Sequence, residues 1–133
     1  VLTHLQACLP NEGVGLLSTL AGPQVIQAVR FYPGRHLNES PSRFTMDPRD
    51  VLRACEGMER EGTRLGVVVH SHPTTVPEPS QTDVRELAMP GVINLIVQMW
   101  PRVHARAWEI SPVGSVELPI RAEAKVSGEG RGV

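Results

Sequence analysis

The 133-residue sequence has little that would commit it to an extracellular, membrane-bound or nucleic-acid-binding role. Its only two cysteines, Cys8 and Cys55, are too few and too far apart for a disulfide framework or a thiolate zinc site. We expect both to be reduced, small core residues of a cytoplasmic protein. Lysine and arginine (13) nearly balance aspartate and glutamate (14), so no charge excess points to nucleic acid or to a membrane surface.

Long hydrophobic runs and internal repeats are lacking as well. No apolar segment is long enough to span a bilayer, and no basic-then-apolar leader with a small-residue cleavage site is visible. The chain does have a hydrophobic content of 41%, in a length that suits one domain with its own core. We therefore expect a single domain over residues 1–120. The tail over 121–133 lacks apolar periodicity and is predicted to be disordered.

The order of the predicted elements indicates an α/β fold with a mixed central sheet flanked by helices. A short helix over residues 1–9 precedes two strands that meet at a turn over residues 21–23, and a loop over 33–43 follows. The remaining predicted elements are a short strand at 44–46, a helix from Asp47-Pro48 to Gly62, a strand at 64–70, a helix from Ser80 to Met89, and strands at 92–100, 104–111 and 115–120. In the helix that begins at Asp47-Pro48, the apolar spacing predicts a core side formed by Val51, Leu52, Cys55 and Met58.

The most informative stretch is LGVVVHSHPTTVPEPSQTD, residues 65–83, in which a buried strand ends in His-Ser-His. Residues i and i+2 of a strand point to the same side, so His70 and His72 present both imidazoles to one point. Asp83 can return to that point across a loop stiffened by three prolines. Two imidazoles and a carboxylate form a set of three protein ligands for Zn²⁺, which leaves the fourth position open for water, as in catalytic sites.

Two other interpretations compete with a metal site. Ser80 and Asp83 also match a capping box before an apolar helix, and paired histidines can be polar residues leaving a core. Capping does not explain two histidines on one side of a buried strand, so the motif as a unit favours metal. Other residues are expected to lie on the surface or to pack in the core or at its edge: His4, His36, His104, Trp100 and Trp108. Arg102 and Arg106 are expected on a solvated strand face.

His70-Ser71-His72-Pro73, followed by Ser80 and Asp83, resembles the signature of the JAMM (MPN+) zinc metallopeptidases. The upstream stretch PNEGVGLL resembles the family's Pro-x-Glu-x-x-Gly segment, with the family's glutamate at Glu12. The stretch NESPSRFTMDPRDVLRA resembles the middle of bacterial and archaeal members, including Asn38 and the Phe-x-x-Asp-Pro pattern at 44–48. The resemblance covers about residues 1–110. One departure is that many members carry cysteine near the glutamate, where this chain has Gly13 and Val14.

The resemblance implies a single MPN domain, with layering like that of cytidine deaminases, that holds one Zn²⁺ per chain through His70, His72 and Asp83. It implies that Glu12 is the general base and that the Ser80 hydroxyl helps to hold the developing oxyanion. Glu12 also stands at the start of an otherwise apolar strand, where an unpaired charge would be costly to bury, so a functional role would explain it. Ser71 points to the opposite side from the histidines and is predicted to serve packing or to support the site.

The resemblance further implies a compact prokaryotic enzyme, similar to the peptidases that release cysteine from a ubiquitin-like sulfur-carrier protein. We expect it to hydrolyse the amide bond after the carrier's terminal Gly-Gly, which releases cysteine or a conjugated protein. The partners are then the carrier or its conjugates, with no nucleic acid and no membrane, and a homodimer stays open. The alternatives are a non-catalytic MPN scaffold and a ubiquitin-type deconjugating enzyme. A DNA-repair-linked module is disfavoured by the near-neutral charge.

Overall fold

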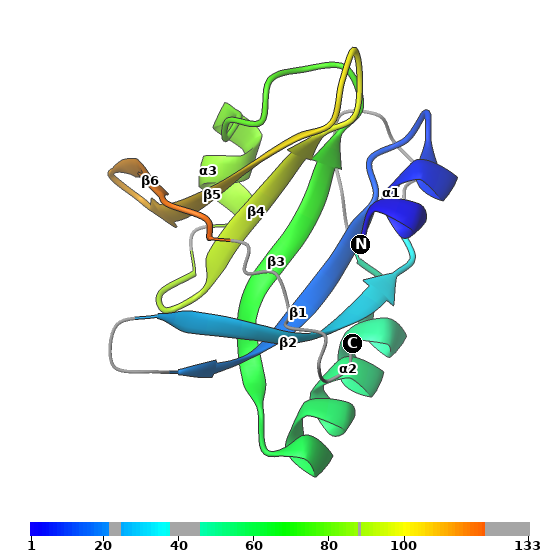
Figure 1. The fold of residues 1–133 in the computed structure, drawn as a ribbon, viewed down its shortest axis with the longest axis vertical. Helices are drawn as coiled ribbons and strands as arrows, with labels where there is room; N and C mark the ends of the chain where they lie inside the picture. Colours follow the sequence, from blue (N-terminus) through cyan, green and yellow to red (C-terminus); the bar gives the residue numbers. More distant parts are fainter. Residues whose placement is uncertain (22–24, 38–45, 88, 122–133) are drawn as a thin grey trace, which may run out of the picture.

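The computed structural model describes residues 1–21, 25–37, 46–87 and 89–121, which form one six-stranded sheet with three helices (Figure 1). The helices are α1 (Leu2–Cys8), α2 (Pro48–Glu61) and α3 (Gln81–Leu87). The strands are β1 (Val14–Ala21), β2 (Ile26–Gly34), β3 (Arg64–His72), β4 (Ile93–Gln98), β5 (His104–Ser111) and β6 (Gly114–Leu118). The predicted α/β class and the order of its elements are confirmed over these residues.

The sheet is mixed, in the order β2-β1-β3-β4-β5-β6. Only β3 and β4 run parallel, and α3 lies on the connection between them, as a parallel crossover requires. The other neighbouring strands pair antiparallel. Several predictions lie wholly or mostly outside the described residues: the turn at 21–23, the loop at 33–43, the strand at 44–46 and the tail over 121–133.

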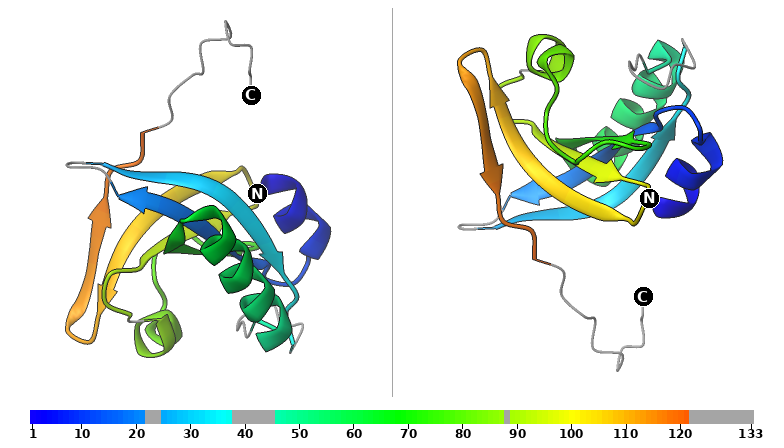
Figure 2. Two further views of the ribbon diagram at one scale, coloured as in Figure 1. Left: turned by 90° about the horizontal axis from the view of Figure 1, so that it is seen from below. Right: turned by 90° about the horizontal axis from the view of Figure 1, so that it is seen from above.

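Both faces of the central strand β3 are buried, as its nearly continuous apolar sequence predicts. Val67 and Val69 face one side, where Leu5 of α1 packs against them. Val68 faces the other side and packs with Met58 of α2. Figure 2 shows α2 and α3 on the same side of the curved sheet. Three layers result, with α1 on one face and the other two helices on the opposite face.

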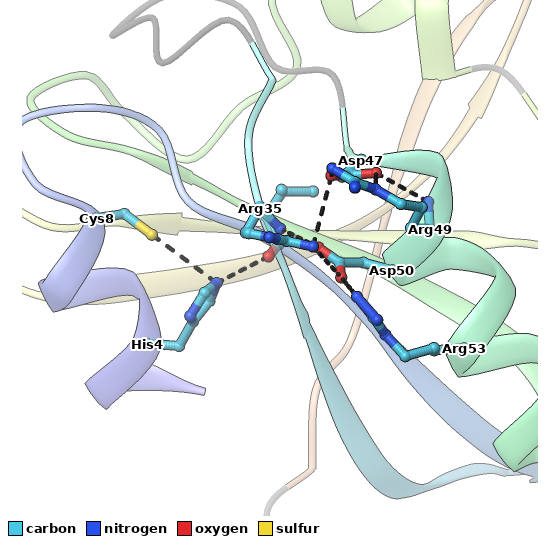
Figure 3. Close-up of polar contacts among 8 residues, drawn as sticks. His4, Cys8, Arg35, Asp47, Arg49, Asp50 and Arg53 are labelled. Atoms are coloured by element: carbon cyan, nitrogen blue, oxygen red, sulfur yellow. Dashed lines mark hydrogen bonds and ion pairs between the residues drawn. The ribbon is translucent and has the colours of Figure 1, made fainter.

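The start of α2 is fixed by the cap that its sequence predicts. The Asp47 carboxylate accepts a hydrogen bond of 2.9 Å from the Arg49 backbone N–H. Figure 3 shows Asp50 between Arg35 and Arg53, whose side-chain nitrogens form ion pairs with it at 3.2 Å and 2.7 Å. The three arginine side chains that pair with Asp47 and Asp50 are exposed, so these ion pairs contribute little to the free energy of unfolding. They connect the end of β2 to the first turn of the helix.

The predicted core side of α2 is partly wrong. Leu52 and Cys55 are exposed, and the buried positions are Ala54, Gly57 and Met58. Small residues occupy most of the buried positions because the helix lies close to the sheet. A Cβ on Gly57 would lie 2.9 Å from the Tyr32 Oη. Both cysteines are free, as expected, but Cys55 is a surface residue and not a core residue.

No helix within the described ranges is long and apolar enough to cross a membrane.

Candidate active site

Two histidines face each other at the end of β3, where the sequence predicts a shared point. His70 and His72 are 0% and 5% exposed, and their Nε2 atoms lie 3.3 Å apart. Both side chains lie on the face of the sheet that carries α2 and α3, because Val68 at the next even position packs there. The sheet therefore aims two imidazole nitrogens at one buried place.

Asp83 of α3 completes the cluster from the other side. Its Oδ2 lies 3.4 Å from the His70 Nε2 and 3.2 Å from the His72 Nε2, and Asp83 is 7% exposed. Ligand atoms about 2.0–2.1 Å from a tetrahedral zinc lie about 3.3–3.4 Å from one another. The three observed separations match the edges of such a tetrahedron, so the residues present fit a metal ion.

The imidazole of His72 is oriented by the loop that follows it. Its Nδ1 donates a hydrogen bond of 2.8 Å to the Val76 carbonyl. With the proton held on Nδ1, the Nε2 atom keeps its lone pair toward the His70 and Asp83 side. A backbone carbonyl on the distal nitrogen is the usual way in which proteins fix a metal-binding histidine.

The capping box and the metal cluster prove to be compatible. The Ser80 N–H donates to the Asp83 Oδ2 at 2.9 Å, and the Asp83 N–H donates to the Ser80 Oγ at 3.0 Å. These are the reciprocal bonds of a capping box. The carboxylate oxygen that accepts from Ser80 is the same one that faces both histidines, so the cap holds the ligand oxygen in place.

The electrostatics of the cluster favour the metal-binding forms of Asp83 and His70, whereas His72 gains proton affinity where it faces the carboxylate. Burial alone would raise the pKa of Asp83, but its contacts with His70 and His72 outweigh burial and hold this pKa well below its usual range. Burial lowers the pKa of His70 in spite of the nearby carboxylate, which favours the neutral imidazole. For His72, the Asp83 carboxylate and the Val76 carbonyl overcome burial and raise the pKa.

Glu12 is buried beside this cluster, just before β1. It is 6% exposed, and burial, reinforced by the Asp83 charge and opposed by His72, raises its pKa to about 7. Val14 pairs with His70 in the antiparallel ladder, so two further residues along the same register would set Glu12 opposite His72. The structure thus brings together the glutamate, the two histidines and Asp83.

Two contacts that support the site are not evident in the sequence. Trp108 of β5 donates from Nε1 to the Pro77 carbonyl at 2.8 Å, within the loop between His72 and Ser80. Arg106 bonds to Glu78 of the same loop at 2.9 Å and stacks over the Trp108 ring. No local pattern signals either contact, because both depend on how β5 passes the loop.

The remaining histidines and the two tryptophans lie outside the cluster of metal ligands. Over the described residues, the only group placed to hold a metal is His70, His72 and Asp83, so His4, His36 and His104 stay outside it. Trp108 is buried as expected, whereas Trp100 is 65% exposed and the prediction that it packs is wrong. It lies beyond the end of β4, where the chain leaves the sheet.

Comparison with known proteins gives one family match. The sequence model described as prokaryotic homologs of the JAB domain matches residues 1–111. A probable TtuB-protein conjugate cleaving protease of Thermus thermophilus is 38% identical over 84 residues, which is 62% of this chain and 53% of that protein. A desampylase of Pyrococcus furiosus is 39% identical over 96 residues, 71% of this chain and 66% of the relative. The chain thus spans about half to two thirds of these relatives.

Two further matches cover more of the chain. The CysO-cysteine peptidase of Mycobacterium tuberculosis is 28% identical over 123 residues, 90% of this chain and 82% of the relative. The solved structure of protein DSY2949 from Desulfitobacterium hafniense superposes with a TM-score of 0.84 at 31% identity, covering 96% of this chain and 88% of that one. The single-domain mixed α/β architecture is therefore shared along nearly the whole chain.

Proposed function

The chain belongs to the family of prokaryotic homologs of the JAB domain, and from that premise we propose that it is a zinc-dependent peptidase acting after the terminal glycines of a ubiquitin-like carrier protein. The observation that carries the proposal is the buried cluster of His70, His72 and Asp83 with Glu12 beside it. Three ligand atoms at tetrahedral separations leave one position open, which distinguishes a catalytic site from a structural one.

His70, His72 and Asp83 would hold one Zn²⁺ per chain. The bound ion supplies Lewis-acid chemistry, since it lowers the pKa of water and polarises a carbonyl. The protein contributes the orientation of each ligand. Val76 fixes the tautomer of His72, and the Ser80 backbone N–H holds the Asp83 oxygen that faces both rings.

Glu12 is the proton acceptor of the proposed reaction. A general base works best when its pKa lies near the operating pH, and burial raises the pKa of Glu12 to about 7. Its carboxylate takes a proton from the attacking water and later delivers that proton to the leaving amine nitrogen. The scissile C–N bond breaks as the amine is protonated, and the carrier leaves with a free carboxylate.

Ser80 is proposed to donate to the oxygen that becomes negative as the carbonyl is attacked. Its Oγ accepts from the Asp83 N–H, so the hydroxyl hydrogen can point toward the substrate. Ser80 is exposed, unlike the ligands, which suits a group that meets the substrate directly. A preorganised donor of this kind stabilises the transition state more than the ground state.

The substrate class comes from the relatives and from access to the site. The Thermus relative is named for TtuB-protein conjugates and the mycobacterial one for CysO-cysteine. The three metal ligands and Glu12 are nearly buried, so the scissile carbonyl has to arrive on a thin, extended segment. Glycines allow such an approach because they carry no side chain. The leaving group is cysteine or a conjugated protein.

The test uses a ubiquitin-like carrier extended beyond its terminal Gly-Gly by a reporter residue. Zinc-loaded protein should cut after the second glycine, lose activity with a chelator, and regain it when zinc is returned. Replacing the second glycine of the substrate by valine should block cleavage. Cleavage that is insensitive to the chelator would refute the zinc mechanism. Equal rates on an unrelated unstructured peptide would refute the substrate class.

A further inference from the structure

Ser71 lies between the two histidines but on the opposite face of the sheet, and it is fully buried. Its Oγ accepts a hydrogen bond of 2.7 Å from the Gly13 N–H, and its own N–H donates to the Gly13 carbonyl at 3.0 Å. In a regular antiparallel pair both N–H groups go to backbone carbonyls. Here a side-chain hydroxyl accepts one of them, just beyond the last ladder pair, Val14 with His70.

The bonded N–H belongs to the peptide group that joins Glu12 to Gly13. A peptide group is planar, so fixing the direction of its N–H also fixes the ψ angle of Glu12. Together with the side-chain torsions, that angle sets where the Glu12 carboxylate lies. The Ser71 hydroxyl therefore acts on the orientation of the carboxylate from the far face of β3, without touching it.

We propose that Ser71 is the positioning residue for Glu12, so that its buried hydroxyl holds the carboxylate over the metal-ligand cluster. This inference rests on the proposed function, in which Glu12 is the base. It concerns placement alone, since Ser71 faces away from His70 and His72. The role predicts a loss of turnover without a loss of metal.

Helix α1 packs closely against Gly13. A Cβ on Gly13 would lie 2.8 Å from the Leu5 Cδ2 and 3.2 Å from the Cys8 Sγ, so α1 is already in contact there. His4 of the same helix donates from Nε2 to the Val14 carbonyl at 3.0 Å, and Figure 3 shows its ring beside Cys8. The helix restricts the space around Gly13, and among the described residues Ser71 is the group that offers this N–H an acceptor.

Removing the hydroxyl leaves a buried N–H without its acceptor. The Glu12–Gly13 peptide then turns, and the carboxylate turns with it. A displacement on the order of 1 Å at a reacting group can cost about 10²-fold in rate. For Ser71→Ala we expect kcat to fall about 10–100-fold, with KM nearly unchanged because Ser71 lies away from the substrate.

The experiment is a double-mutant cycle on zinc-loaded protein with the carrier substrate, using Ser71→Ala, Glu12→Gln and the double variant. If Ser71 acts through Glu12, Ser71→Ala should lower kcat in the wild-type background and change it less than about twofold in the Glu12→Gln background. Zinc content should stay at the wild-type level in all three. Ser71→Thr, which keeps the hydroxyl, should restore most of the turnover.

A readout independent of catalysis uses the zinc-free protein. Hydrogen exchange of the Gly13 amide should be faster in Ser71→Ala than in the wild type, on the order of tenfold. If Ser71→Ala does not fold, Ser71→Cys keeps the shape of the side chain and replaces the hydroxyl by a weak acceptor. The same cycle and the same exchange measurement then apply to that variant.

The outcomes separate this inference from the proposed function. Wild-type turnover in Ser71→Ala, or an equal loss in both backgrounds, would overturn the positioning role. Loss of zinc in Ser71→Ala would overturn it too, since the effect would then pass through the ligands. Full activity in Glu12→Gln would instead refute the proposed base and leave Ser71 without a group to position.

Discussion

The two parts of the candidate site differ in how the chain holds them. His70, His72 and Asp83 come from one continuous segment, residues 70–83, which leaves β3, forms a loop and enters α3. Glu12 comes from a separate segment that leads into β1. The three ligands are assembled largely by local contacts, whereas the position of Glu12 depends on the packing of β1, β3 and α1 against one another.

Contacts within and beside the ligand segment are numerous. His72 bonds to the Val76 carbonyl, Ser80 and Asp83 bond to each other, and Trp108 bonds to the Pro77 carbonyl. Several independent bonds hold this segment, so the loss of one should loosen the metal site without abolishing it. The exceptions are the ligands themselves, which have no substitute.

Glu12 is held through its neighbour Gly13. That residue is bonded to Ser71 on one side and packed against Leu5 and Cys8 on the other. A small change there is expected to leave the metal in place and to move the base. The comparison therefore predicts that metal binding and proton transfer can be damaged separately.

The largest effect is expected for His72→Ala, which removes a ligand. Zinc should be lost from the purified protein, as measured by elemental analysis, and cleavage should fall by at least about 10³-fold. His36→Ala and His104→Ala are the controls and should retain zinc, because both histidines lie outside the cluster. Unchanged zinc in His72→Ala would show that the metal, if present, is held elsewhere.

A smaller effect should follow when the ligand segment loses one supporting bond. Trp108→Phe keeps an aromatic ring and removes the donor to the Pro77 carbonyl. Zinc affinity, measured by competition with a chelator, should weaken about tenfold, as for other contacts that support metal ligands. Trp100→Phe is the matched control, since Trp100 is exposed, and it should not alter affinity. Equal zinc affinity in both variants would mean that the hydrogen bond from Trp108 of β5 does not stabilise the metal-binding loop.

The smallest effect concerns stability in the zinc-free protein. Burial raises the pKa of Glu12 from 4.5 to about 7, so the folded state binds this proton more tightly than the unfolded state. Its stabilising contribution is fully present below about pH 4.5 and is lost as the pH rises to about 7. Glu12→Gln cannot ionise, so it should gain about 1–3 kcal/mol of unfolding free energy relative to the wild type between pH 4.5 and 8.

Thermal unfolding of both zinc-free proteins at pH 4.5 and pH 8 measures this difference. Parallel pH dependence in the two proteins would contradict the raised pKa. It would also weaken the case that Glu12 is buried beside the metal ligands.

The ligand set was predictable from sequence because its geometry is mostly local. Strand alternation places His70 and His72 on one side, and the capping pattern places Asp83 at the start of α3. The strands and helices within the described residues were predictable for the same reason. The role of Glu12 was suggested only by the family resemblance, since no spacing connects it to the histidines.

The predictions that failed depend on tertiary packing. Leu52 and Cys55 carry the right periodicity for a core side, but α2 packs through smaller residues against Tyr32. Trp100 continues an apolar run, yet the strand has already ended. The hydrogen bonds between Ser71 and Gly13 and between Trp108 and Pro77 join segments far apart in sequence, so no local sequence pattern predicts them.

The most direct test of the separation between metal binding and proton transfer measures zinc content and cleavage rate on one preparation of Glu12→Gln. Glutamine keeps the size of the side chain but cannot accept the proton. We predict one zinc per chain, as in the wild type, together with a rate that is about 10²–10⁴-fold lower. Loss of zinc along with the activity would contradict the account, because Glu12 would then be a ligand, and full activity would show that the base lies elsewhere.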